Sequence, residues 1–191
     1  MKVYFTASVT GKQLYDENYR KIVECLRDYG YELMENDILE SDVRQKMYGW
    51  AEKELRENYE RIMGLARKSD IVVAEVSYPS ASVGLEVSNA LGMGKPVVLL
   101  HVSGKRAVLV EGIKSERLQI IEYDMDNLKK LLKQTMVEAE KMLDVRFNFF
   151  ISPKLLDFLN WIAKEKGTTK SAFVRELIKR EMERIKEHGD G

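Results

Sequence analysis

The sequence predicts an α/β fold, a doubly wound, mostly parallel five-stranded sheet with helices on both faces, followed by a small domain that dimerises. Short apolar runs alternate with helical segments through most of the chain, as in parallel sheets that are covered on both faces. Two of these runs, Ile71–Val76 and Val97–His101, are continuously apolar, which is typical of buried parallel strands. After Asp144 the pattern changes to one β run and two helices. We therefore expect two domains, at 1–143 and 144–191.

The elements of the first domain follow one another along the chain. The expected strands are Val3–Ala7, Tyr31–Met34, Ile71–Val76, Val97–His101 and Leu118–Tyr123. The expected helices are Gln13–Tyr29, Ser41–Lys68, a third that follows the Ser77–Ser82 loop and ends near Met93, and Met125–Leu143. Gly30 suits the end of the first helix, and Ser41 is the candidate N-cap of the second.

Composition narrows the classes of protein that remain. Of the 191 residues 32% are charged, and the charges balance to a formal net of zero. The single cysteine, Cys25, excludes an internal disulfide and fits a reducing cytoplasm. His101 and His188 lie far apart in the sequence, so we expect no metal site, and nothing indicates another cofactor. No apolar run approaches the length of about 20 residues that a membrane helix needs.

Loops that follow the strands are the candidate ligand sites, because ligands bind at the carboxyl ends of the strands in such sheets. Three segments qualify: Ser8–Gly11, Ser77–Gly84 and the residues after His101. Backbone N–H groups of Ser8 and Gly11 can approach a ligand there. The second segment leads into a helix N-terminus, which favours anions.

Three stretches of this domain resemble the nucleoside 2-deoxyribosyltransferase family, particularly its nucleotide N-hydrolase branch. They are Val3–Ser8, Ser69–Val76 and Pro79–Glu86, and the resemblance spans about residues 2–125. It implies that Glu86 is the nucleophile that displaces the base from the anomeric carbon, by a glycosyl-carboxylate intermediate. We expect the helix dipole to keep Glu86 ionised. The alternative for Glu86 is an exposed glutamate in a first helical turn.

The resemblance also implies the other site residues. Tyr4 is expected near the sugar, and Ser80 is expected to hold the 5′-phosphate with help from Ser82 and Gly84 at the helix N-terminus. The alternatives are packing within a strand for Tyr4 and a turn or capping role for Ser80. The implied ligand is a deoxynucleotide or nucleoside.

Two departures from the family pattern bear on catalysis. The family carries an aspartate eight residues before the position of Asp70, where this chain has Ile62. Asn58 and Glu60 are close in sequence but are expected to face elsewhere on the helix. Polar groups that a partner subunit donates in the family are replaced by the apolar stretch Ala107–Ile113, although Ser103–Arg106 offers cations for a phosphate.

The last part of the chain pairs a β run with two helices. Val145–Ile151 alternates, with Phe147, Phe149 and Ile151 on one face. Ser152-Pro153 starts a helix that ends at Gly167, and its apolar face carries Leu155, Leu159 and Ile162. Thr169 caps a second helix, which turns Phe173, Val174, Leu177 and Ile178 inward. One strand and two helices cannot bury these side chains alone, so we expect a homodimer or a higher homo-oligomer.

This pattern resembles the ribbon-helix-helix repressors, over the stretch from Arg146 to Ile178. The resemblance implies that two chains pair their strands into a ribbon for the DNA major groove. The outward side chains Arg146, Asn148 and Phe150 would contact bases, and the helix N-terminus at Thr169, Lys170 and Ser171 would bind phosphate. Phe150 stands where the family usually has a polar residue, so DNA binding and dimerisation alone both remain open.

Three functions are compatible with the sequence. The chain is an enzyme that cleaves or exchanges the N-glycosidic bond of a deoxynucleotide, a DNA-binding regulator whose α/β domain senses a nucleotide without turnover, or an enzyme dimerised by its ribbon module. Glu86 favours the first, whereas Ile62 favours the second.

Overall fold

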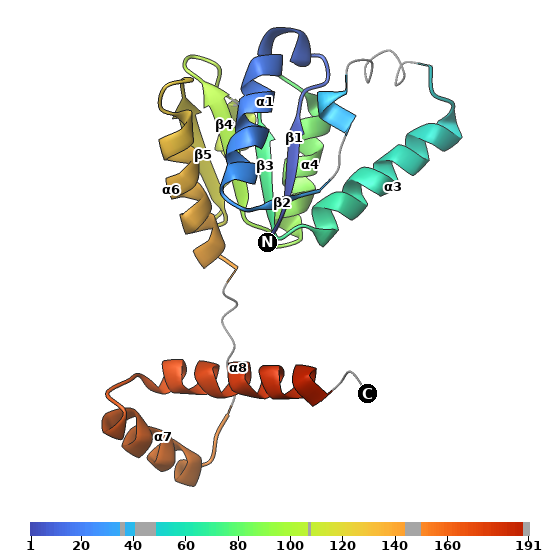
Figure 1. Cartoon of the computed structure of the whole chain (residues 1–191). Coiled ribbons are helices and arrows are strands. Elements are labelled where there is room, and N and C mark those ends of the chain that lie inside the picture. The colour runs from blue at the N-terminus through green and yellow to red at the C-terminus, as the bar shows by residue number, and fades with distance from the viewer. Residues whose placement is uncertain (35–36, 41–48, 107, 144–149, 189–191) are drawn as a thin grey trace. The chain divides into compact units, whose positions relative to one another are not determined.

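The structure, a computed structural model, describes residues 1–34, 37–40, 49–106, 108–143 and 150–188. The chain divides into two compact units, residues 1–145 and 146–191. The first unit contains the sheet and the second contains a pair of helices (Figure 1).

A five-stranded sheet in which all neighbouring strands are parallel forms the centre of the first unit. The strands are β1 (Lys2–Ala7), β2 (Glu32–Leu33), β3 (Ile71–Glu75), β4 (Val97–Val102) and β5 (Leu118–Tyr123). Their order in space is β2-β1-β3-β4-β5. The predicted parallel α/β sheet is therefore confirmed.

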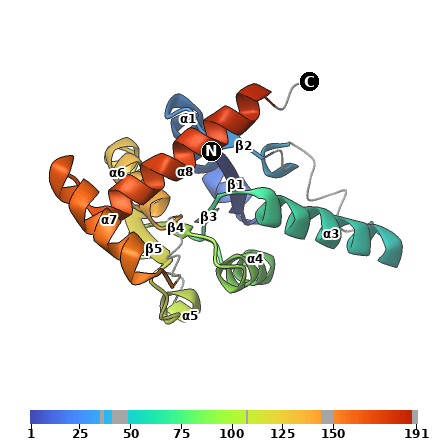
Figure 2. The same ribbon diagram turned by 90° about the horizontal axis from the view of Figure 1, so that it is seen from below.

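Helices cover both faces of this sheet. One face carries α1 (Lys12–Asp28) and α6 (Leu128–Lys141), and the other carries α3 (Glu52–Lys68) and α4 (Ala81–Gly92) (Figure 2). Strand alternation divides the core accordingly: Val3 and Phe5 pack on the side of α1 and α6, whereas Tyr4 packs on the side of α3 and α4.

The order in which the strands are added to the sheet reverses between β1 and β3. The chain goes from β1 to β2 on one side, then crosses to β3, β4 and β5 on the other. Carboxyl ends of β1 and β3 therefore flank the topological switch point, where such sheets bind ligands. Of the three segments predicted for ligand binding, Ser8–Gly11 and Ser77–Gly84 follow these two strands, and the third lies at the end of β4.

Several predicted boundaries were wrong. Ser41 lies outside the described residues, and the helix predicted to start there begins only at Glu52, after a turn at Gly49. The Ala51 N–H donates to Glu54 Oε2 at 2.7 Å, which satisfies a free donor at this start. The helix expected from Met125 begins at Leu128, because the chain first turns about Asp124. Two short helices, η1 (Asp37–Leu39) and α5 (Val108–Glu111), were not predicted.

The second unit contains α7 (Pro153–Glu165) and α8 (Lys170–His188). The predicted caps are confirmed, because Ser152 Oγ accepts the Leu155 N–H at 3.4 Å and Thr169 Oγ1 accepts the Ala172 N–H at 3.1 Å. Gly167 ends the first helix with a φ of 60°, in the left-handed region that glycine adopts easily. Residues 144–149, which hold most of the predicted strand, lie outside the described residues.

None of the helices that the structure describes is both long and apolar enough to cross a bilayer. Among the described residues there is also no group of three or more histidine, cysteine, aspartate or glutamate side chains that could hold a metal ion.

Candidate active site

Tyr4 and Glu86 meet beneath the helical layer of α3 and α4. Tyr4 points from the middle of β1 and is 1% exposed, and Glu86 points from the second turn of α4 and is 9% exposed. The Tyr4 hydroxyl donates a hydrogen bond to Glu86 Oε2 at 2.8 Å. Glu86 is therefore buried and hydrogen-bonded, which excludes the alternative of an exposed first-turn glutamate.

Burial and hydrogen bonding act in opposite directions on the pKa of Glu86. Burial raises the pKa of Glu86 above its ordinary value, and hydrogen bonds from Thr6 and Tyr4 lower it in part. Glu86 is the sixth residue of α4, and the dipole effect falls off within the first turn. The two hydroxyl groups on β1 favour the charged form of Glu86, whereas burial disfavours it. The contribution of the helix dipole stays a prediction.

Tyr4 stays protonated beside this carboxyl group. Burial, and then the charge of Glu86, raise the pKa of Tyr4 well above its ordinary value. A neutral phenol donates its proton to the carboxylate without competing for it. Thr6 lies two residues further along the strand, on the same face as Tyr4. Thr6 was not predicted as a site residue, although the strand period of two places it on the same face as Tyr4.

The two ligand loops pack directly against each other. Ser8 Oγ accepts the Gly11 N–H at 3.1 Å, which closes the first loop. A Cβ atom placed on Gly11 would lie 2.4 Å from the Tyr78 Cβ and 2.8 Å from the Tyr19 hydroxyl. Only glycine permits this approach, so the structure brings the 8–11 loop against the 77–80 loop at the carboxyl ends of β1 and β3.

The N-terminus of α4 follows the second loop. Ser80 is its N-cap, and its Oγ accepts the Val83 N–H at 3.4 Å. Ser82 is exposed in the first turn, and a Cβ on Gly84 would meet open space. The first N–H groups of a helix lack partners within it, so an anion can bind here. The capping alternative for Ser80 is confirmed, and its role towards a phosphate stays a prediction.

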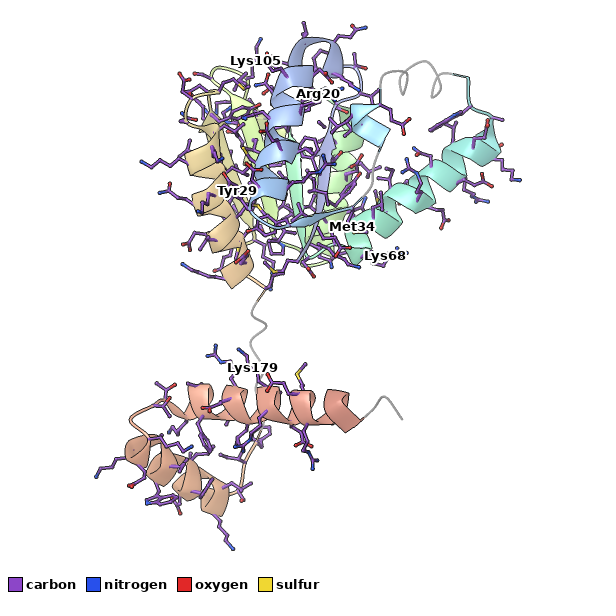
Figure 3. The ribbon with its side chains drawn as sticks, viewed as in Figure 1. Arg20, Tyr29, Met34, Lys68, Lys105 and Lys179 are labelled. Carbon is purple, nitrogen blue, oxygen red and sulfur yellow. The ribbon has the colours of Figure 1, made fainter. Side chains whose placement is uncertain are left out.

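The loop after β4 offers a cation that is already paired. Arg106 Nη2 lies 2.6 Å from Glu111 Oε2, and Glu111 Oε1 lies 3.9 Å from Nε2 of the buried His101. Lys105 lies at the carboxyl end of the sheet, whereas Lys68 lies at the opposite edge (Figure 3). Lys105 therefore lies at the edge of the sheet where a phosphate is predicted to bind. Ala107 lies outside the described residues.

Ile62, where the family resemblance implies aspartate, is half-buried on α3. It packs against the apolar cluster that contains Tyr4, Val83 and Val87. Asn58 precedes it by four residues and therefore lies on the same side of the helix, which corrects the expectation that Asn58 faces elsewhere. Asn58 Oδ1 accepts a hydrogen bond from Arg61 Nη2 at 3.0 Å.

A buried polar network on the opposite face of the sheet was not predicted. Glu75, at the end of β3, is fully buried and accepts hydrogen bonds from the Ser77 hydroxyl and, at 3.2 Å, from the Tyr123 hydroxyl. Ser77 Oγ also accepts the Val102 N–H at 2.8 Å, and Asn18 donates to Tyr123 at 3.1 Å. The network ties the ends of β3, β4 and β5 together. A charged residue at the end of an apolar run was the signal for it.

Fold and site together define a class, that of doubly wound α/β proteins with a buried carboxylate at the switch point, beside a helix N-terminus.

No family model matches the chain. A Thermofilum pendens protein named 2′-deoxynucleoside 5′-phosphate N-hydrolase 1 is 32% identical over 130 residues, 66% of this chain and 88% of its own. A Mus musculus protein named 5-hydroxymethyl-dUMP N-hydrolase is 31% identical over 135 residues, 68% of this chain and 76% of its own.

The chain belongs to the 2′-deoxynucleoside 5′-phosphate N-hydrolase family. Among solved structures, that of a CMP N-glycosidase from Clostridium botulinum aligns with 69% of this chain and 98% of its own, at 18% identity and a TM-score of 0.48.

Proposed function

We propose that the first unit hydrolyses the N-glycosidic bond of a 2′-deoxynucleoside 5′-monophosphate, with Glu86 as the nucleophile. The observation that carries the proposal is the 2.8 Å hydrogen bond from Tyr4 to the buried Glu86, at the switch point of the sheet. The relatives of this chain are named for the same reaction on deoxynucleoside monophosphates. This reaction needs no metal or organic cofactor.

The reaction proceeds in two displacements. A Glu86 carboxylate oxygen bonds to C1′ of the sugar as the bond from C1′ to the base nitrogen breaks, and the base leaves with that electron pair. Water then attacks C1′, loses a proton, and releases deoxyribose 5-phosphate and the Glu86 carboxylate. Tyr4 holds Oε2 of Glu86 throughout, which fixes the direction of attack. If a second base replaces water, the same intermediate gives exchange of the base.

The 5′-phosphate of the substrate is proposed to lie between the two ligand loops. Ser80, Ser82 and Gly84 begin α4, where the helix dipole favours an anion. Ser8 and Gly11 form the neighbouring loop, which packs on Tyr78. Both loops end on the same side of the sheet as the switch point, within reach of a nucleotide whose sugar contacts Glu86.

Incubation with a panel of the deoxynucleoside monophosphates, their unphosphorylated nucleosides and the matching ribonucleotides tests this function. We expect free base from a deoxynucleoside monophosphate, and none with Glu86→Ala. Absence of free base from every compound would overturn the enzymatic function. Binding of a nucleotide without base release would instead favour the second candidate, a nucleotide sensor. The observation that favours a sensor is the apolar Ile62, at the position where the family resemblance implies an aspartate.

Replacement of Tyr4 by Phe is expected to move the acid limb of the kcat/KM profile to higher pH. Glu86 must be ionised to attack, and the Tyr4 hydroxyl lowers the pKa of Glu86 by hydrogen bonding to its charged form. Its removal therefore leaves Glu86 protonated at pH values where the wild type is ionised. Initial rates of base release between about pH 4 and 9 measure the shift.

Tyr31→Phe is the matched control for this change. Tyr31 also donates to a carboxylate, Glu140 at 2.6 Å, but on the side of α6. An acid limb that does not move in Tyr4→Phe, or moves equally in both variants, would contradict the assigned role of Tyr4.

For the second unit we propose a ribbon-helix-helix dimer that binds double-stranded DNA. The supporting observation is the apolar surface that α7 and α8 leave exposed. Among the described residues of this unit only Phe173 is buried, whereas Trp161 is 58% and Ile178 53% exposed. Phe158 contacts Phe173 edge-on, but also stays half-exposed. So large an apolar surface is typical of an interface.

The residues predicted to contact DNA are only partly described. Arg146 and Asn148 lie outside the described residues. Phe150 is fully exposed, and Ser171 is exposed in the first turn of α8. Lys170 donates to Asn160 Oδ1 at 3.0 Å, so it must exchange this partner for a phosphate. DNA retardation that weakens with salt and disappears in Arg146→Ala with Lys170→Ala would support DNA binding, and its absence would leave dimerisation alone.

Introduction of a charge at Ile178 tests the dimer. We expect Ile178→Glu to raise the dissociation constant of the full-length homodimer by about tenfold or more, since an unpaired charge is costly to bury. Sedimentation velocity of the full chain measures this constant. Arg180→Glu, at an exposed position of the same helix, is the control. Equal dissociation constants for Ile178→Glu and the wild type would contradict the proposed interface.

A further inference from the structure

The 77–80 loop is anchored on the face of the sheet opposite to Glu86. Val73 packs on the side of α1 and α6, and Glu75, two residues further along β3, points to the same side and is fully buried. Its carboxylate accepts the Ser77 hydroxyl, and the Ser77 N–H lies 3.3 Å from each of its oxygens. The first residue of the loop is therefore fixed to a buried carboxylate.

Ser77 also ends the pairing of β3 with β4. The Val76 N–H donates to the Leu100 carbonyl at 2.8 Å, as in a regular parallel ladder. The N–H of Val102, the last residue of β4, donates instead to Ser77 Oγ at 2.8 Å. A hydroxyl group carries one proton, and that of Ser77 goes to Glu75. Ser77 therefore acts on a ligand through the course of the loop and not by donating to it.

Few free torsions separate Ser77 from the N-terminus of α4. Tyr78 and Pro79 lie between Ser77 and Ser80, and the Pro79 ring fixes its own φ and restricts the backbone of Tyr78. The Tyr78 Cβ also lies against the other loop, since a Cβ placed on Gly11 would be 2.4 Å from it. A shift of Ser77 is therefore transmitted both to the cap of α4 and to the neighbouring loop.

Tyr19 connects the same network with the 8–11 loop. It is fully buried on α1, and its hydroxyl donates to the Ser8 carbonyl at 3.3 Å. A Cβ on Gly11 would lie 2.8 Å from this hydroxyl. Burial, and then the negative charge of Glu75, raise the pKa of Tyr19 above its ordinary value. Glu75 and its neighbours therefore hold both ligand loops from the opposite face of the sheet.

We infer that Glu75 and Ser77 are positioning residues for the 5′-phosphate of the substrate. Glu75 fixes Ser77, Ser77 fixes the 77–80 loop, and the loop places the N-terminus of α4 for the phosphate. The phosphate site is part of the proposed function, on which this inference rests. The consequence is selectivity: the pair strengthens binding of a phosphorylated nucleotide and adds nothing to binding of the nucleoside that lacks the phosphate.

Dissociation constants of the full-length protein test this role. The measurements are made in Glu86→Gln, so that ligands are not consumed. Calorimetry gives Kd for the four common deoxynucleoside monophosphates, and competition against a bound monophosphate gives Kd for the matching nucleosides. Ser77→Ala leaves both Glu75 and the Val102 N–H without this partner. We expect it to raise Kd for the monophosphates about tenfold and to leave Kd for the nucleosides within about twofold.

Ser69→Ala is the matched control. Ser69 is also a fully buried serine, and its hydroxyl donates to the Ala66 carbonyl at 2.9 Å, but it precedes β3 instead of following it. It should change neither Kd. Urea unfolding of both variants verifies that they are folded, so a loss confined to phosphorylated ligands in Ser77→Ala is not a general structural defect.

Three results would overturn the positioning role and leave the proposed function standing: an unchanged Kd for the monophosphates in Ser77→Ala, an equal rise for the nucleosides, or the same rise in Ser69→Ala. Base release is assayed separately in the protein that retains Glu86. Its absence would overturn the hydrolysis, whereas the dissociation constants would still decide the positioning role. A protein that binds no monophosphate at all would overturn both.

Discussion

Replacement of Glu86 by Gln is expected to lower kcat for base release by about 10⁴-fold or more, the size of loss found when a nucleophile is removed. Glu86 is the carboxylate that the structure buries beside Tyr4, at 2.8 Å from its hydroxyl. Glutamine keeps the shape and can still accept this hydrogen bond, but its amide does not attack C1′. Nucleotide binding by calorimetry should stay within about threefold of wild type.

The same variant should be more stable than the wild type at neutral pH. The pKa of Glu86 is raised in the folded state, so the folded protein disfavours the charged form more than the unfolded chain does. This destabilisation is present above the folded-state pKa and vanishes below the unfolded value. Glu86→Gln should therefore raise Tm at pH 7, and the gain should disappear as the pH falls through the range in which Glu86 is protonated.

Glu138→Gln, an exposed glutamate on α6 that pairs with Lys141, is the control for both measurements. It should change neither kcat nor the pH dependence of Tm appreciably. Wild-type kcat in Glu86→Gln would remove Glu86 from the mechanism. A lower Tm at pH 7 would contradict this account, because it would show that the hydrogen bonds to the Glu86 carboxylate outweigh the cost of burying its charge.

Replacement of Gly11 by Ala is expected to destabilise the first unit by about 1–3 kcal/mol, the range for overpacking in a closely packed site. The new Cβ would lie 2.4 Å from the Tyr78 Cβ and 2.8 Å from the Tyr19 hydroxyl. Tyr78 Cβ is fixed to the backbone of the 77–80 loop, so this loop must move rather than a flexible side-chain end. Urea unfolding of the full chain measures the loss.

The displacement should also reach the substrate. Both loops are proposed to contact the 5′-phosphate, so we expect KM for a deoxynucleoside monophosphate to rise about tenfold, while kcat falls less. Gly92→Ala is the control, because its Cβ would meet nothing within 4 Å and alanine favours the helix by about 0.5–1 kcal/mol. An unchanged KM in a destabilised Gly11→Ala would separate the loop contact from phosphate binding.

Much of the first unit could be predicted because its signals are local. Continuous apolar runs gave β3 and β4, and the alternation of strands and helices gave the parallel sheet. The start of α3 could not be predicted from Ser41, since a charged stretch looks helical whether or not the chain turns at Gly49. The cap at its true start comes from the Glu54 side chain, three residues inside the helix.

The candidate site was predictable in its members but not in its electrostatics. Motif resemblance indicated Tyr4 and Glu86, which lie 82 residues apart in the sequence and meet in the fold. The burial of Glu86 and its hydrogen bond from Thr6 depend on how α4 packs across β1, which the sequence does not show. Asn58 was expected to face away from Ile62, although a spacing of four residues puts the two side chains on the same side of the helix.

Detection of a sugar ester on Glu86 tests the central claim most directly. The full-length protein is mixed with an active deoxynucleoside monophosphate, quenched in acid within the first turnover, digested and analysed by mass spectrometry. The account predicts deoxyribose 5-phosphate attached to the peptide that contains Glu86, formed together with the first equivalent of free base and absent in Glu86→Gln. A full equivalent of free base with the sugar attached to another residue, or to none, would contradict it.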